Sequence, residues 1–173
     1  MTRSVSVAVL IAVLAVLAPS AAAAPGSHGS VNSELAAVRA ATAKYHNVER
    51  ALADGYAAAP DCVSSPDGGM GYHYFNQALF MSPTLDPRQP EVLLYAPLPN
   101  GGRRLVGVEY LYAYGPTAPG PNASVPTMFG HRFDGPMPGH FPGMPWHSEQ
   151  HAWLWQANPK NGMFAPFNPN VRC

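Results

Sequence analysis

The sequence predicts an α+β domain in which an N-terminal amphipathic helix packs on an antiparallel β-sheet or a small β-barrel. Three observations predict this fold. Apolar residues recur at three- and four-residue steps over residues 32–59, which is the period of a helix. Several later segments alternate with a period of two, as strands do. Residues 115–145 hold eight prolines and six glycines, a density typical of a long loop.

The helix is the first predicted element of the domain. Asn32 or Ser33 can cap its start, Glu34 suits the positive end of the helix dipole, and Pro60 would stop it. One stripe along the helix is semi-apolar and is expected to face the core. It comprises Leu35, Val38, Thr42, Tyr45, Val48, Leu52 and Tyr56.

Four strands are predicted after the helix, over residues 70–77, 91–97, 103–114 and 151–156. Asn100 and Gly101 form the strongest hairpin signal in the chain, so the second and third strands should pair. Both faces of the third strand are largely apolar, which indicates a central strand. Val106, Val108 and Tyr110 are expected on one face, and Leu105, Glu109 and Leu111 on the other.

Composition limits the function classes. The chain has 173 residues, and ten Lys and Arg balance ten Asp and Glu. A nucleic-acid-binding protein needs a surplus of positive charge, so that class is disfavoured. The length fits a single globular domain over residues 32–173.

The first 24 residues have the layout of a secretory signal peptide. Arg3 precedes an uncharged apolar run over residues 5–18, and small residues follow up to Ala24. The alternative is an uncleaved anchor, but the run is shorter than the roughly 20 residues that span a membrane. We therefore expect a secreted or extracytoplasmic protein with no stable membrane span after cleavage, and a flexible leader over residues 25–31.

The two cysteines agree with export. Cys62 and Cys173 are expected to form one disulfide that ties the last residue to the end of the first helix. Closing so long a loop is worth on the order of 4–5 kcal/mol in the chain-entropy model. A two-cysteine metal site is the disfavoured alternative, because the chain has no C-x-x-C motif.

Three dispersed residues predict a metal site. Glu109 is the only charged residue in its apolar run, and burying a lone carboxylate is costly unless it is paired, protonated or metal-bound. His73 and His151 occupy strand positions flanked by aromatic residues. Two imidazoles and a carboxylate in one pocket suit Zn, Mn, Fe or Cu. The alternative pairs Glu109 with an arginine and leaves each histidine to its own hydrogen bonds.

Residues 128–151 suggest a second possibility, because thioether and imidazole ligands together suit copper. The alternative is a loop in which methionine fills gaps and histidine meets water. The ligands in question would be Met128, His131, Met137, His140, Met144, His147 and His151.

Residues 147–151 read HSEQH, which is not the H-E-x-x-H zinc motif. On a helix the two histidines would share a face that excludes Glu149. On a strand all three side chains would share a face, but its ends would lie about 13 Å apart, too far for one ion. Only His151, and secondarily His147, is therefore assigned to the predicted site.

The sequence also resembles a group of secreted bacterial proteins, and the similarity implies export without implying an activity. It is carried by residues 69–74 (GMGYHY), 107–110 (GVEY), 151–155 (HAWLW), 158–159 (NP), 162–164 (GMF) and 168–173 (NPNVRC).

The function predicted first is that of a secreted metal-binding protein centred on His73, Glu109 and His151, with the Pro/Gly-rich loop covering the site. Metal-dependent catalysis on a small molecule would extend that role, and the sequence leaves open whether the protein is an enzyme. The alternatives are a non-catalytic secreted binding module and a copper-sequestering protein that uses the Met/His-rich loop.

Overall fold

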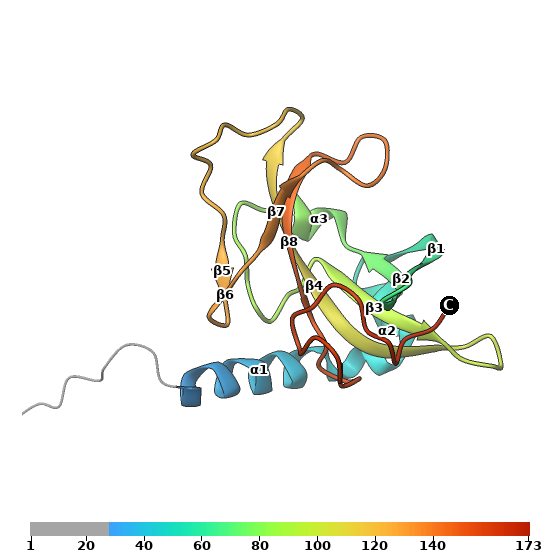
Figure 1. Ribbon diagram of the computed structural model, residues 1–173. Coiled ribbons are helices and arrows are strands. Elements are labelled where there is room, and N and C mark those ends of the chain that lie inside the picture. Colours follow the sequence, from blue (N-terminus) through green and yellow to red (C-terminus); the bar gives the residue numbers. More distant parts are fainter. Residues whose placement is uncertain (1–27) are drawn as a thin grey trace, which may run out of the picture.

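The computed structural model describes residues 28–173 and is mostly one antiparallel sheet that curls into a half-barrel, with few helices (Figure 1). The expected signal peptide (residues 1–24) and the first residues of the leader lie outside this range. Within it, no helix is long and apolar enough to cross a membrane.

The main sheet has six strands in the order β1-β2-β3-β4-β8-β7, and every pair is antiparallel. Its strands are β1 (Ala57–Ser65), β2 (Gly68–Phe75), β3 (Val92–Pro97), β4 (Arg103–Gly115), β7 (Asp134–Met137) and β8 (Trp146–Ala152). A separate hairpin joins β5 (Thr127–Met128) and β6 (His131–Arg132). The helical elements are α1 (His28–Thr42), the 3-10 helix η1 (Ala43–His46), α2 (Val48–Ala53) and α3 (Gln77–Phe80).

The predicted single helix over residues 32–59 is wrong in its extent. The helix begins four residues earlier, at His28, and Asn47 interrupts it and caps α2 by accepting a hydrogen bond from the Glu49 amide. Gly55, with a φ of +89°, ends the helical region, as glycine in the left-handed region commonly does. Pro60 therefore does not stop a helix but lies in edge strand β1, within an irregular stretch of pairing between Ala58 and Cys62.

The β3–β4 hairpin and the central position of β4 are confirmed. One detail of the predicted faces is wrong, because a register shift after Leu94 lets β4 bulge near Gly107. Leu105 therefore joins the core on the same side as Val108 and Tyr110, whereas Val106 joins the core on the other side.

The last strand begins earlier than predicted. β8 covers Trp146–Ala152, and the chain turns away at Leu154, whose amide bonds to the Ala152 carbonyl. The predicted loop over residues 115–145 is also not free of regular structure, since it contains β5, β6 and β7. The β7 strand pairs with β8 and so forms the second edge of the main sheet.

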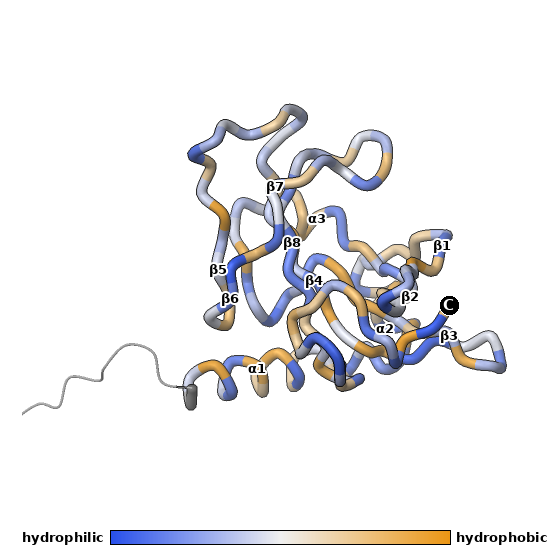
Figure 2. The backbone as a smooth tube through the Cα atoms, viewed as in Figure 1, coloured by the Kyte–Doolittle hydropathy of each residue, from blue (hydrophilic) through white to orange (hydrophobic). Residues whose placement is uncertain are grey.

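The two faces of the sheet are covered differently. On one face, Leu35 and Val38 of α1 and Tyr45 of η1 pack with sheet residues such as Tyr95, whose hydroxyl donates to the Tyr45 carbonyl at 2.6 Å. A smaller apolar cluster, which includes Phe80, Leu94 and Leu111, lies on the other face. Figure 2 shows the corresponding mixture of apolar and polar positions along α1 and the apolar stretches of β3 and β4.

The predicted disulfide between Cys62 and Cys173 is present, with a Cα–Cα distance of 5.6 Å. It ties the last residue to strand β1 rather than to the end of the first helix, because residue 62 is in the sheet. The C-terminal segment also bridges to β2, where Gly69 and Asn168 exchange backbone hydrogen bonds.

Candidate metal centre

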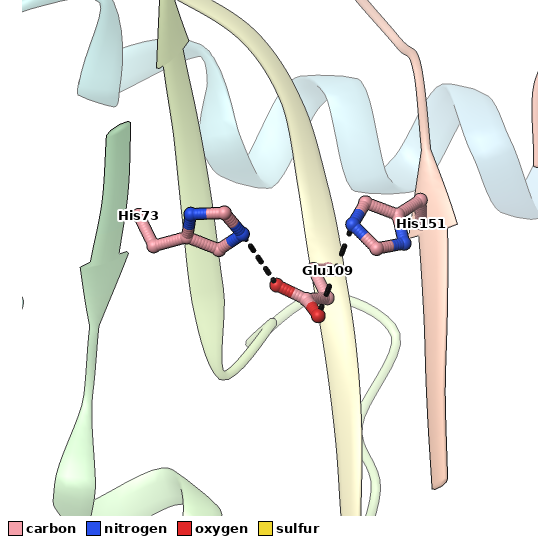
Figure 3. Close-up of side chains that lie close together, drawn as sticks. All are labelled: His73, Glu109 and His151. Carbon is pink, nitrogen blue, oxygen red and sulfur yellow. Dashed lines mark ion pairs between the residues drawn. The ribbon is translucent and has the colours of Figure 1, made fainter. Parts of the chain in front are cut away.

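Three neighbouring regions of the sheet bring His73, Glu109 and His151 together (Figure 3). His73 lies on β2, Glu109 on the central strand β4, and His151 on β8 directly opposite Glu109 in the register. Alternate residues of a strand share a face. The neighbours of these three residues in the apolar clusters place them on the face opposite α1.

The carboxylate of Glu109 lies between the two imidazoles. His73 Nε2 is 3.5 Å from Glu109 Oε2, and His151 Nε2 is 3.9 Å from Glu109 Oε1, so each ring faces a different oxygen. One possible ligand atom from each of the three residues lies within 4.8 Å of the others. Such spacing leaves room for one ion with two nitrogen ligands and one oxygen ligand.

Burial controls the protonation of all three groups. Burial, and then the nearby Glu149 carboxylate, raise the pKa of Glu109 well above its ordinary value. Burial, and then the charge of His151, lower the pKa of His73 to about 4. Burial likewise lowers the pKa of His151 to about 4. Both imidazoles are therefore neutral near pH 7, which is the form that binds a metal.

The two imidazoles differ in their other contacts. The Gly71 backbone favours the protonated form of His73 and so partly offsets the effect of burial on its pKa. A histidine ligand usually donates its second N–H to a nearby acceptor, which fixes the ring orientation. His151 is fully buried, and among the described residues neither of its ring nitrogens has a hydrogen-bond partner. Nearly all buried polar side-chain atoms in proteins are hydrogen-bonded, so such an exception calls for an explanation, such as a bound ion or water.

A second group of possible ligands adjoins the first. It consists of His140, from the segment between β7 and β8, and of His147 and Glu149 on β8. His147 Nε2 is 3.2 Å from Glu149 Oε2, and His140 Nε2 is 3.9 Å from the same oxygen. Burial opposes ionisation of Glu149, but the His147 hydrogen bond and the neighbouring imidazoles outweigh it and lower its pKa to about 2.

A cavity of about 480 Å³ opens beside these residues. His73, Glu109 and His140 contribute to its wall, while most of the remaining lining is apolar and includes Phe75 and Phe141. Pockets for small molecules commonly combine apolar walls with a few convergent polar groups. A small molecule in this cavity would therefore lie against the imidazoles of His73 and His140 and the carboxyl group of Glu109.

The structure thus groups the predicted site residues in a specific way. His73, Glu109 and His151 come together, whereas His147 belongs to the adjoining group with His140 and Glu149. Sequence reasoning did not assign His140 or Glu149 to the site. The alternation of residues 147, 149 and 151 was the available signal for Glu149, but His140 lies in a segment with no periodic pattern.

The structure also bears on two alternatives from the sequence. Among residues 28–173 the ion-pair neighbours of Glu109 are histidines, and Arg103 instead lies over the ring of Tyr72. The Met/His-rich segment does not gather into one site, because Met128 packs against the core beside α1 and His131 contacts the ring of Phe164.

Comparison of the chain with protein-family models, curated proteins and solved structures finds no match.

Proposed function

We propose that this protein binds a first-row divalent metal ion through His73, Glu109 and His151. The observation that supports this most strongly is the convergence of a buried carboxyl group and two neutral imidazoles from three separate strands. The two ring nitrogens of His151, which are buried without a hydrogen-bond partner, also support a metal site, since a metal ion would bind one of them.

The adjacent cavity supports a role for the ion beyond structure. Three protein ligands leave coordination positions free, and a metal with an open position can polarise a substrate or activate water. The cavity borders His73 and Glu109, and its walls are mainly apolar. We therefore propose metal-assisted chemistry on a small, largely apolar molecule as the activity that this site would support.

We place this function outside the cytoplasm. The Cys62–Cys173 disulfide supports this location, because structural disulfides persist in oxidising compartments.

Metal analysis of His73→Ala tests the proposal. Residue 73 is the most accessible of the three, with a side chain that is 19% exposed, so its truncation should leave the fold intact. The disulfide-bonded protein would be stripped with a chelator, loaded with Zn²⁺ or Co²⁺, desalted and measured by mass spectrometry. We expect His73→Ala to weaken binding at this site by more than about 100-fold, beyond the 10- to 100-fold typical of outer-shell changes.

His46→Ala is the matched control, because His46 is exposed and contacts Trp155 instead of the site. It should bind metal as the unchanged protein does. A wild-type protein that folds normally and retains no metal after loading would contradict the proposal and favour the non-catalytic binding module.

Copper sequestration has one specific observation in its favour. The Met144 sulfur accepts a hydrogen bond from the His140 amide, and both residues line the cavity. A thioether beside an imidazole suits Cu(I). Cu(I) affinity that falls in Met144→Leu, with Zn²⁺ affinity unchanged, would favour this function.

A further inference from the structure

The second group of ligands is continuous with the first. His147, Glu149 and His151 are alternate residues of β8 and therefore share a face. In the register with β4, Glu109 lies opposite His151, and Leu111 lies opposite Glu149. Glu109 and Glu149 are thus diagonal neighbours on adjacent strands, where long side chains lie within reach of each other.

The second group also has its ring nitrogens arranged for ligation. His147 Nδ1 lies 3.3 Å from the Pro145 carbonyl oxygen, to which it can donate only as an N–H. With the proton on Nδ1, the neutral ring offers the lone pair of Nε2 to a metal ion, which would replace the present hydrogen bond between Nε2 and Glu149. A backbone acceptor on one nitrogen and a ligand position on the other is the usual arrangement of a metal-binding histidine.

The charges of the two groups do not balance within the protein. The side chains of Glu109 and Glu149 are only 5% and 6% exposed, and no lysine or arginine in the described part of the chain forms an ion pair with either. With one divalent ion bound to the first group, the Glu149 carboxylate would have only the imidazoles of His140 and His147 as partners. A second ion would neutralise it, and the di-iron carboxylate proteins hold their paired ions with glutamates and histidines.

From these contacts we infer that the protein holds two metal ions side by side, the second bound by His140, His147 and Glu149, with the carboxylates of Glu109 and Glu149 between them. The inference rests on the proposed function, since it extends the same site. It assigns His140, the outermost of the six ligands, to the second ion.

Metal stoichiometry separates the two ions. The disulfide-bonded protein would be stripped, loaded with excess Zn²⁺, desalted and measured for metal per chain. We expect two ions in the unchanged protein and one in His140→Ala, whose side chain is 54% exposed and so tolerates truncation. His131→Ala is the matched control, because His131 is exposed and contacts Phe164 outside both groups, and it should retain two.

A spectroscopic readout tests whether the ions are adjacent. With two equivalents of Cu²⁺, the unchanged protein and His131→Ala should show spin–spin broadening in electron paramagnetic resonance. His140→Ala should give the sharper spectrum of an isolated ion. Glu149→Gln provides an independent variant with the same expected loss of one ion and of the broadening.

The other outcomes are distinguishable. A single ion per chain that His140→Ala and Glu149→Gln leave in place would overturn the inference and keep the proposed function. Loss of all metal in His140→Ala would mean that the six residues form one mononuclear site, which also overturns it. Two ions that persist in both His140→Ala and Glu149→Gln would mean that the second ion binds elsewhere, which overturns the inference as well. No bound metal in the unchanged protein would remove the proposed function as well.

Discussion

Glu109 is placed where a negative charge is least favourable. Its side chain is 5% exposed, and the two imidazoles beside it are neutral near pH 7 because burial lowers the pKa of each to about 4. Burial raises the pKa of Glu109 itself well above its ordinary value, so the metal-free protein binds a proton there more tightly than an exposed glutamate does. A metal ion would displace that proton. The residue therefore suits metal binding better than it suits stability of the metal-free fold.

Glu109→Gln should separate these two effects. Glutamine keeps the shape and removes the ionisable group, so the metal-free variant should be at least as stable as the unchanged protein at pH 8. Its metal affinity should fall by more than about 100-fold, beyond what outer-shell changes typically cause. The rise in Tm on adding Zn²⁺ should vanish, since a ligand stabilises only the state that binds it. Thermal unfolding with and without Zn²⁺ measures both.

Glu34→Gln is the control, because this carboxylate lies exposed on α1. It should leave the Zn²⁺-dependent rise in Tm unchanged. A metal-free Glu109→Gln protein that is several kcal/mol less stable, or one that still gains stability from Zn²⁺, would show that Glu109 has a purely structural role.

At this scale the sequence was informative where a polar residue stood alone among apolar ones. Glu109 and its strand face could be predicted from alternation, and His73 and His151 followed from the same pattern. Glu149 could not, because one ion cannot span residues 147–151, and only the structure divides these side chains between two groups. His140 depends on the path of a loop, which local contacts such as its amide bond to Met144 help to define.

At the scale of the strand, Gly71 allows β2 to approach β3 two residues before His73. Its φ is +88°, a conformation that residues with a Cβ rarely adopt. A Cβ at this position would also lie 2.5 Å from the Tyr95 carbonyl oxygen, which is backbone and cannot easily move. The Gly71 backbone also favours the protonated form of the His73 ring, so this strand geometry and the site are connected.

Gly71→Ala should therefore be much more destabilising than Gly101→Ala. Gly101 has a similar φ of +79° but lies in the β3–β4 turn with no atom within 4 Å of an added Cβ. Strain alone should cost about 1–2 kcal/mol there. At residue 71 the clash adds to the strain, and we expect a loss of roughly 2–5 kcal/mol, since overpacking typically costs about 1–3 kcal/mol. Urea unfolding measures both, and equal losses would mean that β2 and β3 can separate freely.

The boundaries of the elements were harder to predict than their order. Ala57, Ala58 and Ala59 favour a helix by propensity, yet they form part of β1, because pairing with β2 decides their conformation. The β5–β6 turn places Phe129 at a φ of +53°, a conformation that a turn prediction assigns to Asn or Gly. Burial of that ring against Tyr110 and Phe164 overrides the local preference.

At the scale of the whole molecule, the disulfide fixes the C-terminal segment to the first edge of the sheet. It joins residues 111 positions apart, and Val171 beside it is buried. The double variant Cys62→Ser/Cys173→Ser should lose about 4–5 kcal/mol of unfolding free energy, as expected for a loop of this length. Guanidinium unfolding measures the loss.

Reduction provides the control for the disulfide. A reductant should lower the stability of the unchanged protein to that of the double variant and should not affect the variant. Full reduction without any change in the unfolding midpoint would show that the other contacts of the C-terminal segment, such as the Gly69–Asn168 bridge, hold it in place unaided.

A second buried carboxyl group sets how stability responds to pH. Glu91 is 2% exposed, and its Oε2 accepts a hydrogen bond from the Leu111 amide at 3.1 Å. Burial nevertheless raises its pKa from 4.5 to about 7. The folded protein therefore binds this proton more tightly than the unfolded chain does. As the pH rises from 4.5 to 7, only the unfolded chain is free to release it, so the contribution of Glu91 to the free energy of unfolding falls.

The expected contribution of Glu91 over this interval is about 3 kcal/mol, because each pKa unit corresponds to about 1.4 kcal/mol. Glu91→Gln cannot ionise, so in metal-free protein its unfolding free energy should rise by this amount relative to that of the unchanged protein between pH 4.5 and 7. Glu109 gives both proteins a slope of the same sign as Glu91, whereas His73 and His151, whose pKa values are lowered to about 4, give both a slope of the opposite sign. Glu49→Gln, which removes an exposed carboxylate from α2, controls for the loss of one charge. Parallel curves for Glu91→Gln and the unchanged protein would mean that Glu91 ionises equally in both states. The half-barrel would then admit enough water at the start of β3 to solvate a carboxylate.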